Sequence, residues 1–552
     1  MQKDQAEKSL FWADQLAQEI AGREKFHYLD KPLPKLKEYV VKTAASVSGV
    51  LHIGRLSDTI RCDSVFNSLC ESGKKARLIW VADNMDPLRK IPKGVPESYS
   101  KYIGVPVTDV PDLHGCHKSY AEHHVSKYLK VIHMFVSGRI ETYSMREEYK
   151  KGSFREEIGK IIRSQPLIVE IQNRYRPKDN PVRKDWFPWM PVCGNCGKII
   201  TTKFLGYKEG FVKYQCSDYK FEKHTAKGCG HKGEDDPLKG NGKLLYKSEL
   251  AAQWARWKVC TEGFGKEYQV PGSAFWINGE IAEKALGFPM PVPIFYEHLM
   301  IDNEKMSASK GNVIYPADWL KVAPPELIRF LYNKKLMKTR SFSWSSLPLL
   351  YDDYDMHERV FFGKQEVQNE KERQHMKRLY AISQISVPKA MPAHIPFDFV
   401  AMVSQIFQEE KTSEAIRLFI STGHLKEKPS ASAKRQIKAR LDYARRWAEH
   451  YAPEQARIRL VDKPPEGLKL SQAQKESLKE LAAMLEKKGM NQEELHSLFW
   501  EIAKKHSLGP QDFFRAVYLV LLGKESGPKL APFILAVGQK KAAGLLRKAQ
   551  PT

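Results

Sequence analysis

Apolar and polar residues alternate along the first half of the chain in a way that predicts strands and helices in turn. Residues 9–22 place apolar side chains three or four positions apart, which predicts an amphipathic helix. Residues 39–44 and 76–82 are short apolar runs typical of strands, and residues 56–69 between them have helical spacing. The order strand, glycine turn, helix, strand is a βαβ unit. We therefore predict an α/β fold with a doubly wound, parallel, Rossmann-type sheet.

A different pattern occupies residues 177–245, which are rich in Gly, Lys, Cys and aromatic residues. This composition is typical of a small module held by metal. Helix–strand alternation resumes near Leu244 and continues to about Pro316. From about Pro324 the periodicity is mainly helical, and we predict a separate all-α domain in the C-terminal third. Its predicted helices are residues 399–420, 432–451, 471–488, 491–506 and 510–523.

The net charge narrows the choice of partner. The 552 residues include 89 Lys and Arg against 65 Asp and Glu, a formal net charge of +24. Residues 351–552 hold only +9 of this excess, so the charge is spread along the chain. A broad basic balance favours a large polyanion, most simply nucleic acid, over a merely soluble basic protein.

Composition also argues against several classes of protein. The first eight residues, MQKDQAEK, are charged and lack the apolar core of a signal peptide. No apolar run approaches the ~18–20 residues of a membrane span. Eight cysteines in 552 residues form no disulfide scaffold, and four of them lie between residues 193 and 229, as metal ligands would. We expect a cytoplasmic, multidomain protein that handles nucleic acid and no membrane.

The first candidate motif, Ser48-Gly49-Val50-Leu51-His52-Ile53-Gly54, lies between the first predicted strand and its helix. Ligands of open parallel sheets bind where strands end, beside helix N-termini that favour phosphate. Gly49 and Gly54 let the backbone approach a ligand, and His52 can donate a hydrogen bond to a phosphate. Alone, His-Ile-Gly is a weak signal, because three residues recur often by chance.

The second candidate motif, Lys305-Met306-Ser307-Ala308-Ser309-Lys310-Gly311, follows about 250 residues later. Two lysines, two hydroxyls and a glycine suit a loop that closes over a triphosphate, where charge stabilisation is usually the largest catalytic effect. A polar surface loop is the alternative if this motif is taken alone. The two motifs in this order, within an α/β pattern, are a specific signal.

The pair resembles the HIGH and KMSKS boxes of class I aminoacyl-tRNA synthetases. Other segments resemble the class I lysyl-tRNA synthetases of the archaeal type, and the resemblance covers nearly the whole chain. These segments are residues 11–14, 82–92, 109–112, 115–123, 305–314, 513–518 and 527–528.

The resemblance implies a two-step reaction with lysine, ATP and tRNA as substrates. The lysine carboxylate attacks the α-phosphate of ATP, pyrophosphate leaves, and the 3′-terminal ribose of tRNA then accepts the lysyl group. Magnesium would accompany ATP, although no motif identifies its ligands. Little covalent work by the protein is needed, because holding phosphates and neutralising the leaving pyrophosphate are sufficient. The residues that the resemblance assigns to these tasks are Ser48, Gly49, His52, Gly54, Lys305, Ser307, Ser309 and Lys310.

The sequence departs from the family near the expected amino-acid pocket. The family's Gly-Lys-Asp-His appears as Gly265-Lys266-Glu267-Tyr268, and the Trp expected beside Glu249 is Leu250. The usual Pro before Ser48 is Val47, and Arg55 replaces the usual Asn or His. Such changes either alter which amino acid fits the pocket or are compensated by other changes in the sequence. We expect the pocket to include Gly265 and Tyr268, with Asp83, Glu249 or Glu267 facing the ε-ammonium of lysine.

A first metal site is predicted at Cys193-x2-Cys196, Cys216 and Cys229. Thiolates at the spacing of the first pair suit tetrahedral Zn²⁺. The second pair is twelve residues apart, so His224 or His231 remains an alternative to one thiol. Reduced cysteines without a metal are the other alternative.

A second metal site is implied at Asp112, Cys116, His117 and His123, where archaeal-type members of the resembling family hold a second zinc. One carboxylate, one thiol and two imidazoles make a plausible set of four ligands. Spacing alone favours a polar loop leading into a helix. We interpret His114, His124 and His133 as bystanders.

The resemblance also implies a division of labour along the chain. We expect a monomer, and we keep two alternatives: a paralogue that activates another amino acid or acceptor, and a silent tRNA-binding relative. The predicted parts are a first catalytic half (1–110), a connective insertion with zinc (111–243), a second catalytic half (244–320), a helical stem-contact region (321–398) and a helical anticodon-binding domain (399–552).

Overall fold

The computed structural model describes residues 11–47, 50–91, 95–306, 311–393, 395–407, 411–465, 467–487 and 489–549. The chain divides into two compact units. Unit 1 comprises residues 1–319, 325–342 and 367–387, and unit 2 comprises residues 320–324, 343–366 and 388–552. Among the described residues, no helix is long and apolar enough to span a membrane.

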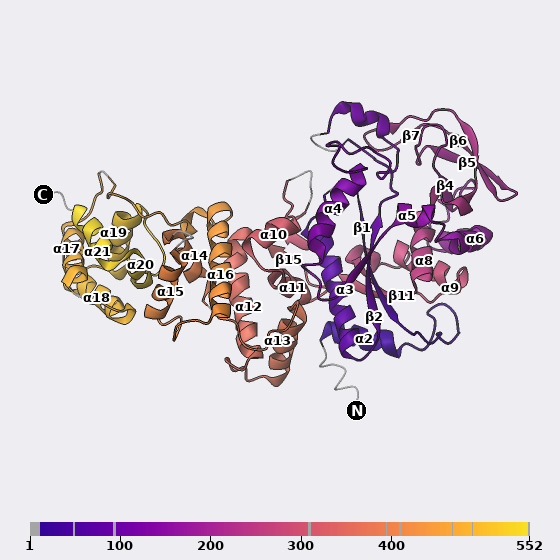
Figure 1. The fold of residues 1–552 in the computed structure, drawn as a ribbon. Coiled ribbons are helices and arrows are strands. Elements are labelled where there is room, and N and C mark those ends of the chain that lie inside the picture. Colours follow the sequence, from indigo (N-terminus) through magenta and orange to yellow (C-terminus); the bar gives the residue numbers. More distant parts are fainter. Residues whose placement is uncertain are drawn as a thin grey trace. The chain divides into compact units, whose positions relative to one another are not determined.

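Unit 1 is built on a five-stranded sheet in the order β12-β11-β1-β2-β3, and every pairing is parallel. Figure 1 labels β1, β2 and β11 of this sheet. The predicted parallel α/β fold is therefore confirmed, with β1 and β2 pairing from Tyr39↔Ala76 to Ser46↔Asp83. The strands are β1 (Tyr39–Ser46), β2 (Ala76–Asp83), β3 (Ile140–Ser144), β11 (Val259–Gly265) and β12 (Val292–Tyr296).

Helices cover both faces of this sheet. Val40, Ile79 and Val81 share a core with Trp254 of α8 and Phe275 of α9. Because side chains alternate along a strand, Trp80 points to the other face, where its ring lies 5.6 Å from that of Tyr128 in α4. The helices of unit 1 are α2 (Trp12–Gly22), α3 (Ile53–Glu71), α4 (Tyr120–Ile132), α5 (Met145–Lys150), α6 (Arg155–Arg163), α7 (Gln165–Arg174), α8 (Tyr246–Trp257), α9 (Ala274–Lys284), α11 (Pro325–Asn333) and α13 (Glu370–Ser383).

The insertion predicted around residues 177–245 forms small antiparallel sheets. β4 (Trp189–Pro191) pairs with β10 (Gly242–Leu244), and this ladder forms the base of the insertion. Between them lie β5 (Thr202–Lys208), β6 (Phe211–Cys216) and β9 (Lys232–Asp235) in one sheet, and β7 (Tyr219–Lys220) with β8 (Thr225–Ala226) in another. A further sheet consists of β13 (Leu299–Ile301), β14 (Glu304–Lys305) and β15 (Arg340–Phe342). The second motif begins in β14 and lies between β13 and β15 in the sequence.

Unit 2 is helical, as predicted. The stretch 399–420 is two helices rather than one, because the sequence Gln408-Glu409-Glu410-Lys411 contains no apolar residue to continue the buried stripe. Two further helices, α20 and α21, follow the last predicted one. Its helices are α12 (Leu347–Phe361), α14 (Phe397–Ile406), α15 (Thr412–Ser421), α16 (Ala431–His450), α17 (Gln472–Lys487), α18 (Gln492–Lys505), α19 (Pro510–Leu522), α20 (Leu530–Val537) and α21 (Gln539–Lys548), and α10 (Pro316–Val322) joins the two units in sequence.

Candidate active site

A cavity of about 420 Å³ opens in unit 1 beside the carboxyl ends of β1, β2, β11 and β12. Open parallel sheets bind their ligands in this position. Every predicted pocket residue that the structure describes lines it, namely His52, Gly54, Asp83, Glu249, Gly265, Glu267, Tyr268 and Lys305. The predicted residues Ser48, Gly49, Ser307, Ser309 and Lys310 lie outside the described residues.

His52 is the N-cap of α3 and is held as a neutral hydrogen-bond donor. Its Nδ1 accepts a hydrogen bond from the backbone N–H of Gly54 at 3.1 Å, so the neutral ring carries its proton on Nε2. Burial, with a smaller contribution from the positive charge of Arg55, lowers the pKa of His52 to about 4. The imidazole therefore stays uncharged at neutral pH and offers one N–H to a ligand in the cavity.

Gly54 allows the two motifs to meet. A Cβ at this position would lie 2.7 Å from Cε1 of His52 and 2.8 Å from Cε of Met306, closer than real Cβ atoms come to other atoms. The backbone just after the second motif also meets α3, because Ile53 N–H donates to the carbonyl of Ile314 at 2.8 Å. The start of α3 and the first two residues of the second motif, Lys305 and Met306, line the same side of the cavity.

The opposite wall carries a buried chain of charges. Lys243 Nζ lies 3.0 Å from an oxygen of Asp86 and 3.1 Å from an oxygen of Glu249. Burial alone would lower the pKa of Lys243, but the two carboxylates raise it above its usual value. Burial raises the pKa of Glu249 to about 6, although Lys243 opposes the rise. Glu249 also accepts a hydrogen bond from Tyr149 Oη at 2.7 Å, so both of its oxygens have partners.

Asp83 faces the same space with fewer partners. Gln253 Nε2 donates to one of its oxygens at 3.1 Å. No other side-chain partner is found for it among the residues that the structure describes. Asp83 therefore has an oxygen that a cationic ligand can occupy.

The residues that depart from the family line the cavity mouth. Glu267 Oε2 lies 2.9 Å from Nε2 of His298, and Tyr268 Oη lies 2.9 Å from Tyr246 Oη. Burial would raise the pKa of Glu267, but its own backbone N–H and His298 lower it overall. Leu250 lines the cavity and is buried, so an aliphatic side chain stands where the family has an indole.

Sequence reasoning missed several lining residues, of which Lys243 and Tyr246 contribute most to the site's contacts. Lys243 lies in the apolar run Gly242-Lys243-Leu244-Leu245, where a lone lysine is a signal of a buried ion pair. Tyr246 has no such signal. The other missed residues are Ala44, Ser46, Arg55, Asp58, Asp86, Glu262, Gly263, Phe264, Tyr296, His298 and Leu299.

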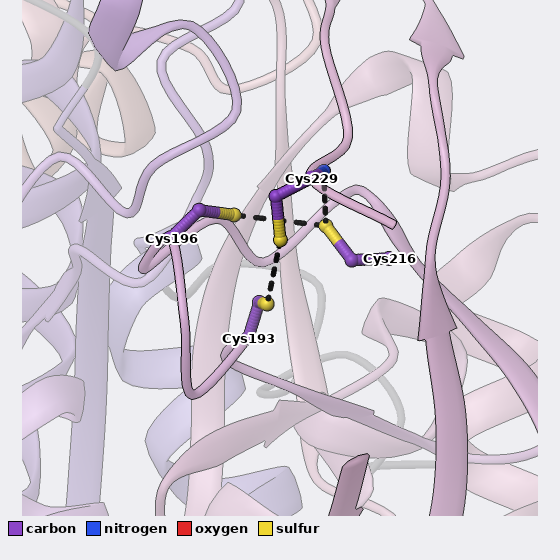
Figure 2. A group of neighbouring side chains, drawn as sticks. All are labelled: Cys193, Cys196, Cys216 and Cys229. Atoms are coloured by element: carbon purple, nitrogen blue, oxygen red, sulfur yellow. Dashed lines mark hydrogen bonds between the residues drawn. The ribbon is translucent and has the colours of Figure 1, made fainter. Parts of the chain in front are cut away.

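The four cysteines of the insertion converge, as Figure 2 shows. Sγ of Cys193 lies 3.7 Å from that of Cys229, and Sγ of Cys196 lies 3.6 Å from that of Cys216. Four thiolates around Zn²⁺ at about 2.3 Å stand about 3.8 Å apart, so the group fits tetrahedral zinc. Neither His224 nor His231 belongs to the group, which consists of the four thiols.

The second predicted set also comes together. Cys116 Sγ lies 3.1 Å from Nδ1 of His117 and 3.3 Å from Nδ1 of His123, and Asp112 lies 3.1 Å from His123. Nε2 of His117 is 2.8 Å from Ser126 Oγ, which fixes the ring with Nδ1 turned inward. These four donors match a zinc site in type and number. His114, His124 and His133 are outside the group.

Comparisons with known proteins identify the family of this chain. The family described as "tRNA synthetases class I (K)" matches residues 10–386, and the "Anticodon binding domain" family matches residues 453–549. A "Lysine--tRNA ligase" of Methanosphaera stadtmanae is 30% identical over 541 residues, which are 96% of this chain and 97% of that protein. A "Lysine--tRNA ligase" of Thermococcus kodakarensis is 33% identical over 547 residues, which are 97% and 99% of the two chains.

A solved glutamate tRNA ligase of Elizabethkingia meningosepticum aligns over 93% of this chain and 99% of its own, at 12% identity and a TM-score of 0.39, too low to support inference. The family match over residues 10–386 contains both motifs and every residue of the cavity. This chain therefore belongs to the class I (K) tRNA synthetases, the enzymes that use ATP to join an amino acid to tRNA.

Proposed function

We propose that this enzyme ligates lysine to the 3′ end of its tRNA through a lysyl-adenylate. The observation that carries the choice of lysine is the charge of the cavity. Its lining contains six carboxylates against three Lys or Arg side chains: Asp58, Asp83, Asp86, Glu249, Glu262 and Glu267 against Arg55, Lys243 and Lys305. An excess of acidic groups favours an amino acid with a cationic side chain.

ATP binds, in this proposal, at the wall made by the two motifs. Nε2–H of His52 donates to a phosphate oxygen, and the positive end of the α3 helix dipole favours negative charge at this position. Lys305 and Lys310, with Ser307 and Ser309, neutralise charge on the pyrophosphate as it leaves. Mg²⁺ bound to the phosphates supplies further neutralisation.

Asp83 is the proposed acceptor of the ε-ammonium of lysine. Both oxygens of Glu249 already have partners, and Glu267 is paired with His298 at the exposed mouth. Asp83 has a single side-chain hydrogen bond and lines the same cavity. The phenols of Tyr246 and Tyr268 close the cavity above the aliphatic part of the substrate.

Two structural zinc ions complete the proposal, one in each donor set. Four thiolates hold the first, and Asp112, Cys116, His117 and His123 hold the second. None of the eight cysteines forms a disulfide, which fits the reducing compartment that this proposal assumes. The insertion at 111–243 then contacts the acceptor end of tRNA, and the helical region from 399 onward contacts the anticodon arm.

The experiment that tests this proposal is lysine-dependent ATP–pyrophosphate exchange with Asp83→Asn. Losing a buried charge partner costs about 2–5 kcal/mol, so kcat/KM for lysine should fall roughly 30- to 4,000-fold. The amide retains an oxygen for Gln253, which preserves the fold. Asp179→Asn, at an exposed position of unit 1, is the matched control and should exchange like the parent.

Exchange must also be measured across the twenty amino acids, because Leu250 and Tyr268, two of the positions that depart from the family, line the cavity. Exchange with another amino acid and none with lysine would establish the paralogue. No exchange with any amino acid would favour the silent tRNA-binding relative.

A further inference from the structure

Lys243 is a cation in the wall of a cavity that is proposed to bind a cationic substrate. It is 6% exposed, lines the cavity and belongs to β10, where it is in register with Met190 of β4. Because side chains alternate along a strand, Leu244 points the opposite way, into the core of unit 1. The pairing of β10 with β4 thus fixes the ammonium in the cavity wall. Since a buried like charge opposes the binding of a cation, this ammonium bears on which cation can enter.

The ammonium of Lys243 engages two carboxylates of the cavity wall. Its Nζ lies 3.0 Å from Asp86 Oδ1 and 3.1 Å from Glu249 Oε2. The second oxygen of Asp86 accepts a hydrogen bond from Ser46 Oγ at 3.2 Å. The second oxygen of Glu249 accepts one from Tyr149 Oη at 2.7 Å. All four carboxylate oxygens therefore have partners while Lys243 is in place.

Asp83 is the carboxylate of this wall that Lys243 leaves to the substrate. It ends β2, and Asp86 follows three residues later. Gln253 Nε2 donates to Asp83 Oδ1 at 3.1 Å, and Gln253 lies one helical turn after Glu249 in α8. The end of β2 and helix α8 thus bring the three carboxylates to the same part of the cavity, with Asp83 Oδ2 open to a ligand.

An ammonium and a guanidinium make different demands on this wall. An ammonium is a compact charge that a single carboxylate oxygen can hold, whereas a guanidinium is a planar group with five N–H donors that pairs best bidentately. With Lys243 in place, the wall offers Asp83 alone, and the ammonium repels a second cation that reaches further. Without Lys243, Asp86 Oδ1 and Glu249 Oε2 would also be open to the donors of a guanidinium.

We propose that Lys243 is a specificity-determining residue that makes the enzyme reject arginine. This inference rests on the proposed lysine ligase function and deepens it. Lys243 engages the carboxylates that a guanidinium needs and leaves Asp83 for the ε-ammonium of lysine. Arginine then enters with buried donors that remain unpaired, which a polar site penalises strongly.

The test is the ratio of kcat/KM for arginine to kcat/KM for lysine in ATP–pyrophosphate exchange by the full-length enzyme. Lys243→Met frees both carboxylates and should raise this ratio roughly 10- to 150-fold, as expected for a gained hydrogen bond between charged groups. Both substrates have a cationic side chain, so the general attraction of a more negative cavity cancels in the ratio. The folded fraction of the enzyme cancels as well, because both rates are measured on one preparation.

Two further variants control for folding and for space. Lys243→Met combined with Glu249→Gln has no orphaned charge at Glu249, so it folds more readily, and the freed Asp86 should still raise the ratio. Lys243→Met combined with Asp86→Asn and Glu249→Gln adds the same space without a freed carboxylate. The ratio in this triple variant should stay near that of the parent.

The outcomes separate this inference from the proposed function. Absence of lysine-dependent exchange in the parent refutes the proposed function and this inference with it. If the parent exchanges with lysine, an unchanged ratio in the single and double variants overturns the role of Lys243 alone. An equal rise in the triple variant also overturns it, because added space and not freed carboxylates would then admit arginine.

Discussion

Lys243 offers the sharpest test of how the cavity wall is held. It is 6% exposed, and its ammonium lies between carboxylates of Asp86 and Glu249 at 3.0 and 3.1 Å. The substitution Lys243→Met keeps most of the side-chain volume and removes the charge. Asp86 retains Ser46 Oγ, at 3.2 Å, as a partner. Glu249 retains only Tyr149, so a buried carboxylate is left without a cation.

Breaking a buried ion pair from one side costs about 3–5 kcal/mol, because the remaining charge has no compensation. We expect Lys243→Met to lower the free energy of unfolding of unit 1 by this amount at pH 8. Lys213→Met is the matched control, since Lys213 pairs with Glu234 at the surface at 3.0 Å. Exposed pairs contribute less than about 1 kcal/mol.

The loss of stability caused by Lys243→Met should become smaller as the pH is lowered. Burial raises the pKa of Glu249 from 4.5 to about 6, so the protonated form is favoured by folding. Stability linked to this group is present at low pH and is lost as pH rises through the folded pKa. Removing Lys243 raises that pKa further, so the loss extends to higher pH. The stability difference between variant and parent should shrink on going from pH 8 to pH 5, by at most about 1.4 kcal/mol per unit.

Urea unfolding followed by tryptophan fluorescence suits this measurement, because eight of the eleven tryptophans belong to unit 1. The double variant Lys243→Met with Glu249→Gln removes the orphaned charge and should recover at least half of the lost stability. Equal stability of Lys243→Met and the parent at pH 8, or a difference that does not change with pH, would refute the reasoning.

Two further predictions concern the other parts of the site. Gly54→Ala places a methyl group 2.7 Å from Cε1 of His52 and should lower the rate of pyrophosphate exchange about 100-fold with the fold intact; a rate within about threefold of the parent would contradict the close approach of the motifs. Cys229→Ser removes one of four thiolates and should lower the zinc content of the purified protein by about one ion per chain; an unchanged content would exclude zinc from this group.

Much of the fold follows from local patterns. The βαβ unit was predictable because its two buried parallel strands are mainly apolar and α3 begins at a polar N-cap, His52. The helical third was predictable from its periodicity, apart from the break after α14. The candidate residues of the cavity, Glu249 and Tyr268 among them, depended on resemblance to a family, since no spacing along the chain brings them near His52.

The missed residues were invisible for a physical reason. Lys243 meets Asp86 across 157 positions of sequence, and the contact exists only because β10 returns beside the end of β2. An isolated lysine in an apolar run indicates burial, but the run does not identify its partner. Tyr246 pairs with Tyr268 through a similar return of the chain.

The strand that carries Lys243, β10, also connects the cavity to the insertion that holds the four cysteines. The insertion leaves unit 1 through β4 and returns through β10, where Lys243 is in register with Met190. Trp189 Nε1 donates to Asp235, at the end of β9, at 2.7 Å, which fixes this ladder to the sheet carrying Cys216. A metal held by the four thiols would therefore brace the strand that supplies a cation to the cavity wall.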